Sequence, residues 1–189
     1  EPAASQPATP TPAAPKTPPT APAKPPVDVV AESDAQRATF AQLRAGAPTD
    51  DPVLAVAADA AERAGIAPSV FRRFFGAMRQ DLTTTRYETW DDLLGYMDGS
   101  AATIGEMMLP VLGATSPHAL GPARSLGLAF QLTNFLRDID EDLTRGRVYL
   151  PADEIAAHGV DREVLYWCQR NRRTDARLRA ALIEQHIAS

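Results

Sequence analysis

The segment 131–142 places side-chain oxygens at helical intervals. Asn134, Asp138 and Asp142 follow one another at four-residue spacing, and Gln131 falls in the same sector of the helix. On a helix this spacing makes one row with a rise of about 6 Å per step. Two carboxylates one turn apart can each give an oxygen to Mg²⁺, which keeps several waters and takes further ligands from phosphate oxygens. The row borders the apolar face of its helix, which favours a position at the mouth of a cavity.

Arginines accompany the same row. Arg137, Arg145 and Arg147 lie within or just after it and could neutralise phosphate oxygens that a metal leaves uncovered, as sites that expel a diphosphate require. Asn134 could supply a neutral oxygen. The spacing alone leaves a second interpretation open, in which the acidic residues are solvated surface charges and Asp142 pairs with Arg145.

The elements that would position these residues are helices. Beyond residue 27, turn signals divide the chain into helix-length segments with almost none of the alternation that is typical of strands, which predicts an all-α domain. The expected helices are 33–44, 52–64, 67–82, 90–112, 122–142, 153–157 and one from 161 onward.

The expected helix 90–112 has the clearest apolar face, and small residues lie among the apolar ones. Gly95, Gly99 and Gly105 are unfavourable inside a helix, so the pattern indicates that something approaches this helix closely. A second helix and a bound ligand explain the small residues equally well.

Composition divides the chain into a tail and one domain. Ten of the 17 prolines lie in the first 26 residues, in a stretch rich in Ala and Thr that cannot bury enough surface to order itself. We therefore expect a disordered Pro/Ala-rich linker at 1–27 and a single domain at 28–189.

Charge and cysteine content exclude several classes of protein. The net charge of −5 argues against nonspecific binding to nucleic acid. The single cysteine, Cys168, excludes an internal disulfide framework and indicates a reducing compartment, so we expect a cytoplasmic protein. No run of about 20 apolar residues indicates a helix that spans a membrane.

The run Leu126–Pro151 closely resembles the second aspartate-rich motif of the squalene and phytoene synthase family. The resemblance covers about 50–160 and is strongest to the phytoene synthase branch in the stretch 145–151, which reads RGRVYLP. Three upstream stretches are similar to the middle segment of that family: 75–82, 86–93 and 96–105.

The resemblance implies an isoprenoid-synthase-type helical bundle around a central cavity, of which this chain holds a part. It also implies a transferase that joins two allylic prenyl diphosphates head to head with Mg²⁺, or with Mn²⁺ in its place. Two geranylgeranyl diphosphates would give phytoene, a step of carotenoid biosynthesis. The alternatives are a C30 synthase that makes squalene or dehydrosqualene, with NADPH only for squalene, and a catalytically inactive relative that serves as a scaffold.

The resemblance assigns roles to individual residues. Asp138 and Asp142 match the metal-binding carboxylates, and Arg137, Arg147 and Tyr149 match residues at the diphosphate end. The substrate contacts that we expect in addition are Gln131, Asn134, Arg145, Asp81, Asp98 and Met108, of which Asn134 also serves the metal.

For two of these residues, Asp81 and Asp98, a second interpretation remains open. Asp81 with Arg86 and Tyr87 could form a second diphosphate cluster, or a buried structural ion pair. Asp98 stands where squalene-forming relatives carry a tyrosine, and it could be a polar group in the pocket or a surface charge.

One departure from the family pattern concerns the first aspartate-rich motif. No Asp-x-x-x-Asp occurs before Asp138, so we expect that motif to lie upstream in the full protein and the 189-residue chain alone to be inactive. The Arg-rich C-terminal helix is expected to form a solvated face, with peripheral contact to anionic lipid as an alternative.

Overall fold

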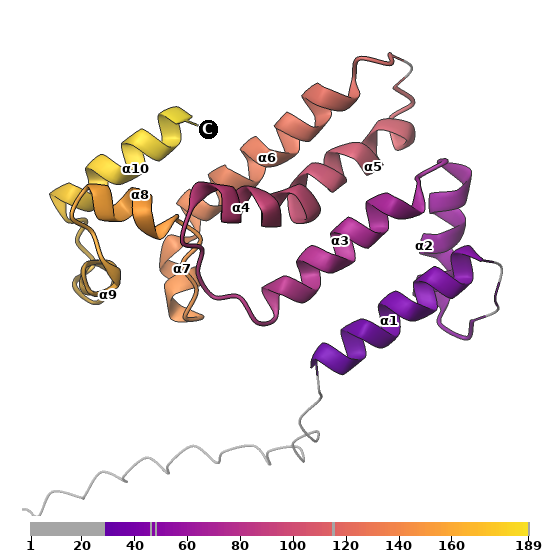
Figure 1. The fold of residues 1–189 in the computed structure, drawn as a ribbon, viewed down its shortest axis with the longest axis horizontal. Helices are drawn as coiled ribbons and strands as arrows, with labels where there is room; N and C mark the ends of the chain where they lie inside the picture. Colours follow the sequence, from indigo (N-terminus) through magenta and orange to yellow (C-terminus); the bar gives the residue numbers. More distant parts are fainter. Residues whose placement is uncertain (1–28, 46, 48, 115, 189) are drawn as a thin grey trace, which may run out of the picture.

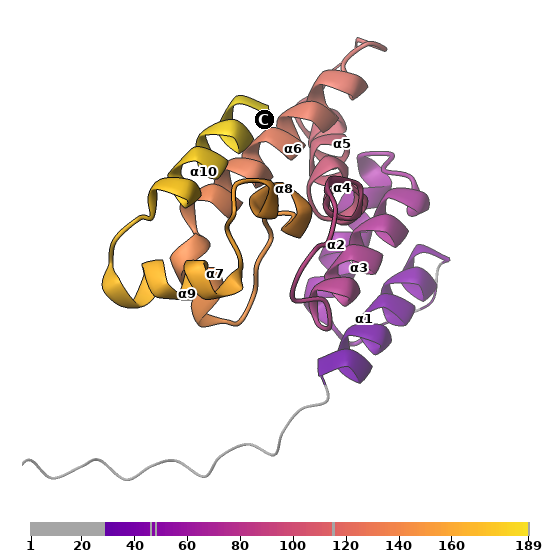
Figure 2. The same ribbon diagram turned by 60° about the vertical axis from the view of Figure 1, so that its left-hand side comes forward.

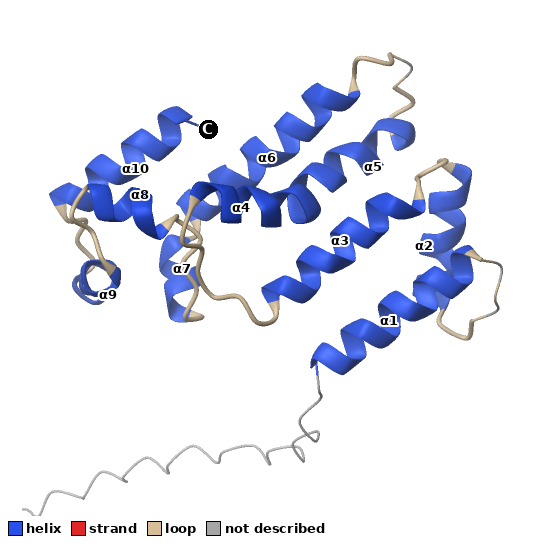
Figure 3. Cartoon of the chain, in the orientation of Figure 1, coloured by secondary structure: helices blue, strands red, loops and turns tan. Residues whose placement is uncertain are grey.

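The computed structural model describes residues 29–45, 47, 49–114 and 116–188, and the helical elements in these ranges confirm the all-α prediction (Figure 3). Outside the helices, the described residues pair as β-structure only at an isolated bridge between Arg86 and Val148. The linker predicted at 1–27 lies outside the described residues. The elements are α1 (Val29–Arg44), α2 (Pro52–Arg63), α3 (Pro68–Asp81), α4 (Trp90–Met97), the π-helical segment η1 (Asp98–Ala102), α5 (Thr103–Val111), α6 (Leu120–Arg137), α7 (Ile139–Thr144), α8 (Ala152–Ala157), α9 (Arg162–Asn171) and α10 (Ala176–Ala188).

The helices form two ends joined by a middle group (Figure 1). Helices α1, α2 and α3 lie at one end, α4, α5 and α6 in the middle, and α8, α9 and α10 at the other end, and the turned view shows the same order (Figure 2). No helix in the described part of the chain is long and apolar enough to cross a membrane.

Side-chain caps start three of the helices. The Asp51 carboxylate accepts from the main-chain N–H groups of Val53 and Leu54 at the start of α2, and Asp161 caps α9 in the same way. Thr89 and Asp92 form a reciprocal capping box at α4. The start expected for the first helix, near residue 33, was wrong: α1 begins at Val29.

The helix expected over 90–112 contains a π-helical segment that divides it into α4, η1 and α5. A Cβ on Gly99 would lie 2.5 Å from the carbonyl oxygen of Arg73 in α3, so the helix backbones are in direct contact there. The Thr103 hydroxyl donates to the Gly99 carbonyl within the wider turn. Because a π-helical turn holds an extra residue, the directions of side chains before and after it depart from a regular helical wheel.

Glycines also bring α6 close to α5 and to η1. A Cβ on Gly105 would collide with the carbonyl of Ala123, and one on Gly127 would lie 2.5 Å from the carbonyl oxygen of Ala101. A contact between helices therefore explains Gly99 and Gly105, whereas Gly95 has nothing within 4 Å of its Cβ position.

The helix expected over 122–142 is divided at Asp138. Its φ of −99° and ψ of 12° end α6 and begin α7. The Asp138 N–H still donates to the Asn134 carbonyl at 2.8 Å, and the Asp142 N–H donates to the Asp138 carbonyl at 2.9 Å. The three side chains therefore remain about one turn apart.

Three clusters of apolar side chains form the core and hold the helices together. Phe40 of α1 packs against Phe71 and Phe75 of α3 at one end. The middle cluster contains Tyr87, Leu93, Tyr96, Met97, Leu132 and Phe135, and the third contains Leu143, Leu150, Ile155, Val160, Leu165, Cys168, Leu178 and Ala181. The candidate site lies where α3 and α6 meet the loop 145–151.

Candidate active site

Asp81, the last residue of α3, receives hydrogen bonds from three side chains. Oδ1 accepts from the Tyr149 hydroxyl at 2.8 Å and from the Tyr96 hydroxyl at 3.3 Å. Oδ2 accepts from Nη1 of Arg147 at 2.9 Å. Nη2 of Arg147 donates to the Asp81 carbonyl oxygen at 2.8 Å, so the guanidinium grips the main chain as well. We call these four residues the Asp81 cluster.

Of the two residues that we expected beside Asp81, Arg86 was wrong. Arg86 pairs with Glu88 at 2.5 Å on the surface, and Arg147 takes the place that Arg86 was expected to occupy. Tyr87 does pack beside the cluster, with its ring centroid 5.4 Å from that of Tyr96.

Aromatic rings enclose the Asp81 cluster. Tyr149 stacks on Phe135 with centroids 4.1 Å apart and an interplanar angle of 8°. Burial raises the pKa of Tyr96 to about 12, and burial also raises the pKa values of Tyr87 and Tyr149. The three phenols therefore stay protonated at neutral pH, and Tyr96 and Tyr149 act as hydrogen-bond donors to Asp81. The Tyr87 hydroxyl is buried and has no hydrogen-bond partner among the described residues.

Main-chain pairing brings the loop 145–151 to the segment 82–89 that follows α3. The Val148 N–H donates to the Thr85 carbonyl at 2.9 Å, and the Ala152 N–H donates to the Tyr87 carbonyl at 3.0 Å. Gly146 has a φ of 75°, a left-handed conformation that favours glycine and turns the chain after α7. This pairing joins segments more than 60 residues apart, so local spacing could not show it.

The two aspartates of the row have different surroundings. Arg137 binds Asp138 through Nε and Nη2, both at 2.7 Å, and its hydrogen bonds hold the pKa of Asp138 below its ordinary value. Asp142 is half-buried, and burial together with the charge of Asp138 raises its pKa. None of the described residues pairs with the Asp142 carboxylate: Arg145 binds Glu141, not Asp142.

Asp142 adjoins the Asp81 cluster. Asp142, Arg147 and Tyr149 line the same small cavity, whose volume is about 10 Å³, roughly the space of one water. Phe135 of α6 and Ile139 and Leu143 of α7 form apolar walls. An acidic, a cationic and a phenolic group thus meet at one point of low polarity.

The other expected site residues lie at different places. Gln131 and Asn134 are half-buried on α6, on the turns before Asp138. Met108 is 42% exposed on α5, away from the Asp81 cluster.

Asp98 belongs to a ring of alternating charges with Arg73, Arg124 and Glu106. Arg73 binds Asp98 at 3.1 Å and Glu106 at 2.5 Å, and Arg124 binds the same two carboxylates. Burial alone would raise the pKa of Asp98, but hydrogen bonds from Arg124 and Arg73 outweigh it and hold the pKa below its ordinary value. We call these four residues the charge ring; it ties α3, η1, α5 and α6 together.

The donor set around Asp142 suits Mg²⁺ in kind. Asp138 and Asp142 offer two carboxylates one turn apart, and an unpartnered carboxylate whose pKa is raised by burial and by a like charge is stabilised by a cation. Within the described ranges no group of three or more His, Cys, Asp or Glu side chains is arranged to hold a metal. The chain therefore offers two carboxylates, and water and phosphate oxygens would complete the coordination.

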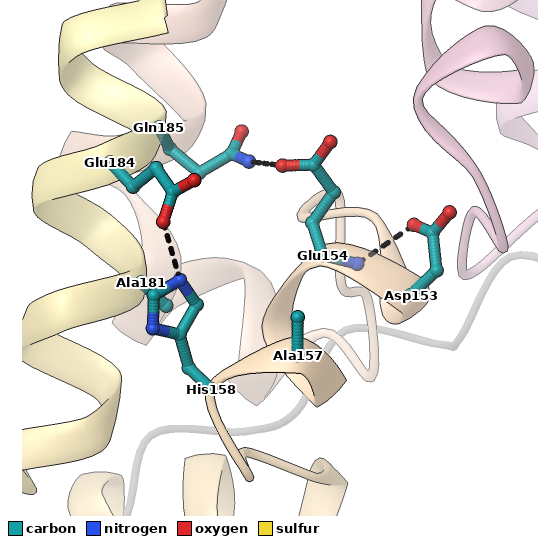
Figure 4. Close-up of a pocket in the computed structure, with 7 residues that line it drawn as sticks. All are labelled: Asp153, Glu154, Ala157, His158, Ala181, Glu184 and Gln185. Atoms are coloured by element: carbon teal, nitrogen blue, oxygen red, sulfur yellow. Dashed lines mark hydrogen bonds and ion pairs between the residues drawn. The ribbon is translucent and has the colours of Figure 1, made fainter.

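A separate pocket of about 490 Å³ lies between α8 and α10 (Figure 4). Most of its polar side chains pair with one another: Nε2 of His158 lies 2.8 Å from Oε2 of Glu184, and Gln185 donates to Glu154. These contacts join α10 to α8, and Gln185 also lines a small cavity with Tyr149.

Comparisons with known proteins identify the protein family to which this all-helical fold and the row of Asn134, Asp138 and Asp142 belong. The chain belongs to the squalene/phytoene synthase family, because the family model described as Squalene/phytoene synthase matches residues 20–187. The resemblance stated from the motifs is thereby confirmed.

Sequence relatives include phytoene synthases of plants and bacteria. Phytoene synthase 1, chloroplastic, from Arabidopsis thaliana is 42% identical over 122 residues, which are 61% of this chain and 29% of the relative. The 15-cis-phytoene synthase of Synechococcus elongatus is 37% identical over 145 residues, which are 70% of this chain and 47% of the relative. The chain thus spans less than half the length of these curated relatives.

Solved structures share the fold. The squalene synthase HpnC from Alicyclobacillus acidocaldarius matches with a TM-score of 0.73 and 25% identity, over 88% of this chain and 62% of that one. A dehydrosqualene synthase in complex with ligand matches with a TM-score of 0.72 and 26% identity, over 82% of this chain and 53% of that one.

Proposed function

We propose that the protein condenses two allylic prenyl diphosphates head to head, and that two geranylgeranyl diphosphates give phytoene. The observation that carries the proposal is the convergence of Asp142, Arg147 and Tyr149 on one small cavity beside Asp138. The identities of 37% to 42% to phytoene synthases support the substrate class.

Each group at the cavity has a role in diphosphate release. Asp138 and Asp142, with Asn134 on the preceding turn, would hold Mg²⁺ through oxygen atoms. Bound Mg²⁺ would neutralise charge on the leaving diphosphate. Arg147 would donate to phosphate oxygens through the N–H groups that Asp81 leaves free. Tyr149 lies beside it and donates its single O–H to Asp81.

The apolar side chains around the cavity protect the cation that forms when the diphosphate leaves. When the carbon–oxygen bond breaks, the diphosphate takes the electron pair and leaves an allylic cation. Water would capture such a cation, so the stacked rings of Phe135 and Tyr149 exclude it from this side of the site. The double bond of the second substrate then attacks the cation in place of water, and loss of a proton closes a cyclopropyl intermediate. This intermediate still carries the second diphosphate, which leaves with its electron pair in a second ionisation.

A C30 product is the second candidate, and the two solved structures described above favour it. They are a squalene synthase and a dehydrosqualene synthase. The two candidates differ in the prenyl chain that is consumed, so the products distinguish them. An inactive relative that acts as a scaffold is the remaining candidate, and it predicts no turnover of either substrate.

The test supplies the complete protein with Mg²⁺ and either farnesyl or geranylgeranyl diphosphate, and identifies the hydrocarbon products by mass spectrometry. We expect a C40 hydrocarbon from geranylgeranyl diphosphate. A C30 product alone would replace the first candidate with the second, and no product from either substrate would contradict both. The isolated 189-residue chain is expected to give no product.

A further inference from the structure

Asp81 uses most of its hydrogen-bonding capacity within the fold. Its carboxylate accepts from Tyr149, Tyr96 and Arg147, and its carbonyl accepts from Arg147 as well. A carboxylate occupied by three side-chain donors is poorly placed to bind a metal or to meet a phosphate. Asp81 therefore differs from Asp142, which none of the described residues pairs with.

Arg147 depends on Asp81 for its orientation. It lies in the loop after α7, outside any helix, and both of its terminal nitrogens point to Asp81. A guanidinium held at two points has a fixed plane, and its remaining N–H groups have fixed directions. Arg147 also lines the cavity that Asp142 shares.

Tyr149 depends on the same carboxylate. Its hydroxyl donates to Oδ1 of Asp81 at 2.8 Å and lies 3.3 Å from Nη1 of Arg147. One carboxylate thus fixes two side chains of the loop 145–151, and the single O–H of Tyr149 is used in this contact.

We propose that Asp81 is a positioning residue that holds Arg147 beside Asp142, so that the N–H groups of Arg147 that Asp81 leaves free can bind a diphosphate near the Asp142 carboxylate. The inference rests on the proposed function. It assigns to Asp81 a role that acts through Arg147, without contact between Asp81 and the substrate.

The variants that test this role are Asp81→Asn, Asp81→Glu, Arg147→Lys and the double variant Asp81→Asn/Arg147→Lys. Asp81→Asn keeps one acceptor oxygen but removes the charge that fixes the guanidinium, and Asp81→Glu restores the charge on a longer side chain. Glu88→Gln is the matched control, because it removes the acidic partner of the exposed Arg86 nearby.

Two quantities are measured on the complete protein without substitutions, called the parent protein, and on the variants. Only variants whose helical circular dichroism spectrum matches that of the parent protein are used. The first is the affinity for inorganic pyrophosphate in Mg²⁺ by calorimetry, and the second is kcat and KM with geranylgeranyl diphosphate. We expect Asp81→Asn to weaken pyrophosphate binding and to lower kcat/KM by about 100-fold, the scale of a misplaced positioning group. Asp81→Glu should recover part of the loss, and Glu88→Gln should match the parent.

The double variant separates positioning from a purely structural role. If Asp81 acts through Arg147, the double variant should lose little more than Arg147→Lys alone, because both changes disable the same donor. Additive losses, or an Asp81→Asn variant that binds pyrophosphate as the parent does, would overturn the inference.

Failure of the proposed function gives a different pattern. A parent protein that binds pyrophosphate but yields no hydrocarbon would contradict the proposed function, while the effect of Asp81→Asn on pyrophosphate binding would still support the positioning role. A parent protein that binds no pyrophosphate would overturn the positioning role.

Discussion

The main-chain N–H of Asp142 donates to the carbonyl of Asp138 at 2.9 Å, which keeps the two carboxylates one turn apart across the break between α6 and α7. The side chains of Asp138 and Asp142 nevertheless have different surroundings. Arg137 compensates Asp138, whereas Asp142 is half-buried and has no partner among the described residues.

Asp142→Asn is expected to stabilise the fold when Mg²⁺ is absent. Like charges one turn apart cost about 0.2–0.5 kcal/mol, so the free energy of unfolding at pH 7 should rise by about that amount. Mg²⁺ with pyrophosphate should stabilise the parent protein and leave the variant unchanged. Urea unfolding with and without these additions measures both effects. Loss of stability in the additive-free variant would show that Asp142 has a structural partner.

The charge ring predicts a stability that falls in acid. Its guanidinium groups hold the pKa of Asp98 below the unfolded value of about 3.9, so an unfolded chain binds more protons than the folded one in that range. The stabilisation is complete above pH 4 and is lost as the pH falls through the lowered pKa. The free energy of unfolding between pH 5 and 2 should therefore fall more steeply for the parent protein than for Asp98→Asn. Parallel curves would contradict the assignment.

Two glycine substitutions should change stability in opposite directions. Gly105→Ala forces a Cβ into the main chain of Ala123 and should destabilise the protein by about 1–3 kcal/mol. Gly95→Ala meets nothing within 4 Å and should stabilise it by about 0.5–1 kcal/mol, because alanine favours a helix. Thermal unfolding of both variants tests the close packing of α5 on α6, and equal shifts would refute it.

Tyr87→Phe should also stabilise the protein. Its hydroxyl is buried without a partner among the described residues, a condition that costs about 1–3 kcal/mol. Tyr149→Phe is the control with the opposite expected sign, since it removes the donor to Asp81. Urea unfolding compares the two. A loss of stability in Tyr87→Phe would reveal a partner for this hydroxyl in solution.

Local patterns in the sequence predict most of the helices but not their interruptions. Asp51 before Pro52 predicts the start of α2, because the cap is a local interaction. The π-helical segment arises where Gly99 meets the backbone of Arg73 in α3, and spacing within one helix carries no sign of that contact.

The candidate site also has one part that local spacing predicts and another part that it does not. The row Asn134, Asp138 and Asp142 follows from helical spacing and stays together in the structure. The pairing of Asp81 with Arg147 joins residues 66 positions apart, so proximity in sequence favoured Arg86 instead. Asp98 was left between two interpretations, and the charge ring places it among Arg73, Arg124 and Glu106.

The most direct measurement is diphosphate release from geranylgeranyl diphosphate by the complete protein in Mg²⁺, compared with its Asp138→Ala variant. We expect the parent protein to release diphosphate and Asp138→Ala to lose the first ionisation, while Glu141→Ala, which removes an exposed partner of Arg145, retains it. Diphosphate release by Asp138→Ala at the parental rate would contradict the assignment of the aspartate row to the metal and the diphosphate.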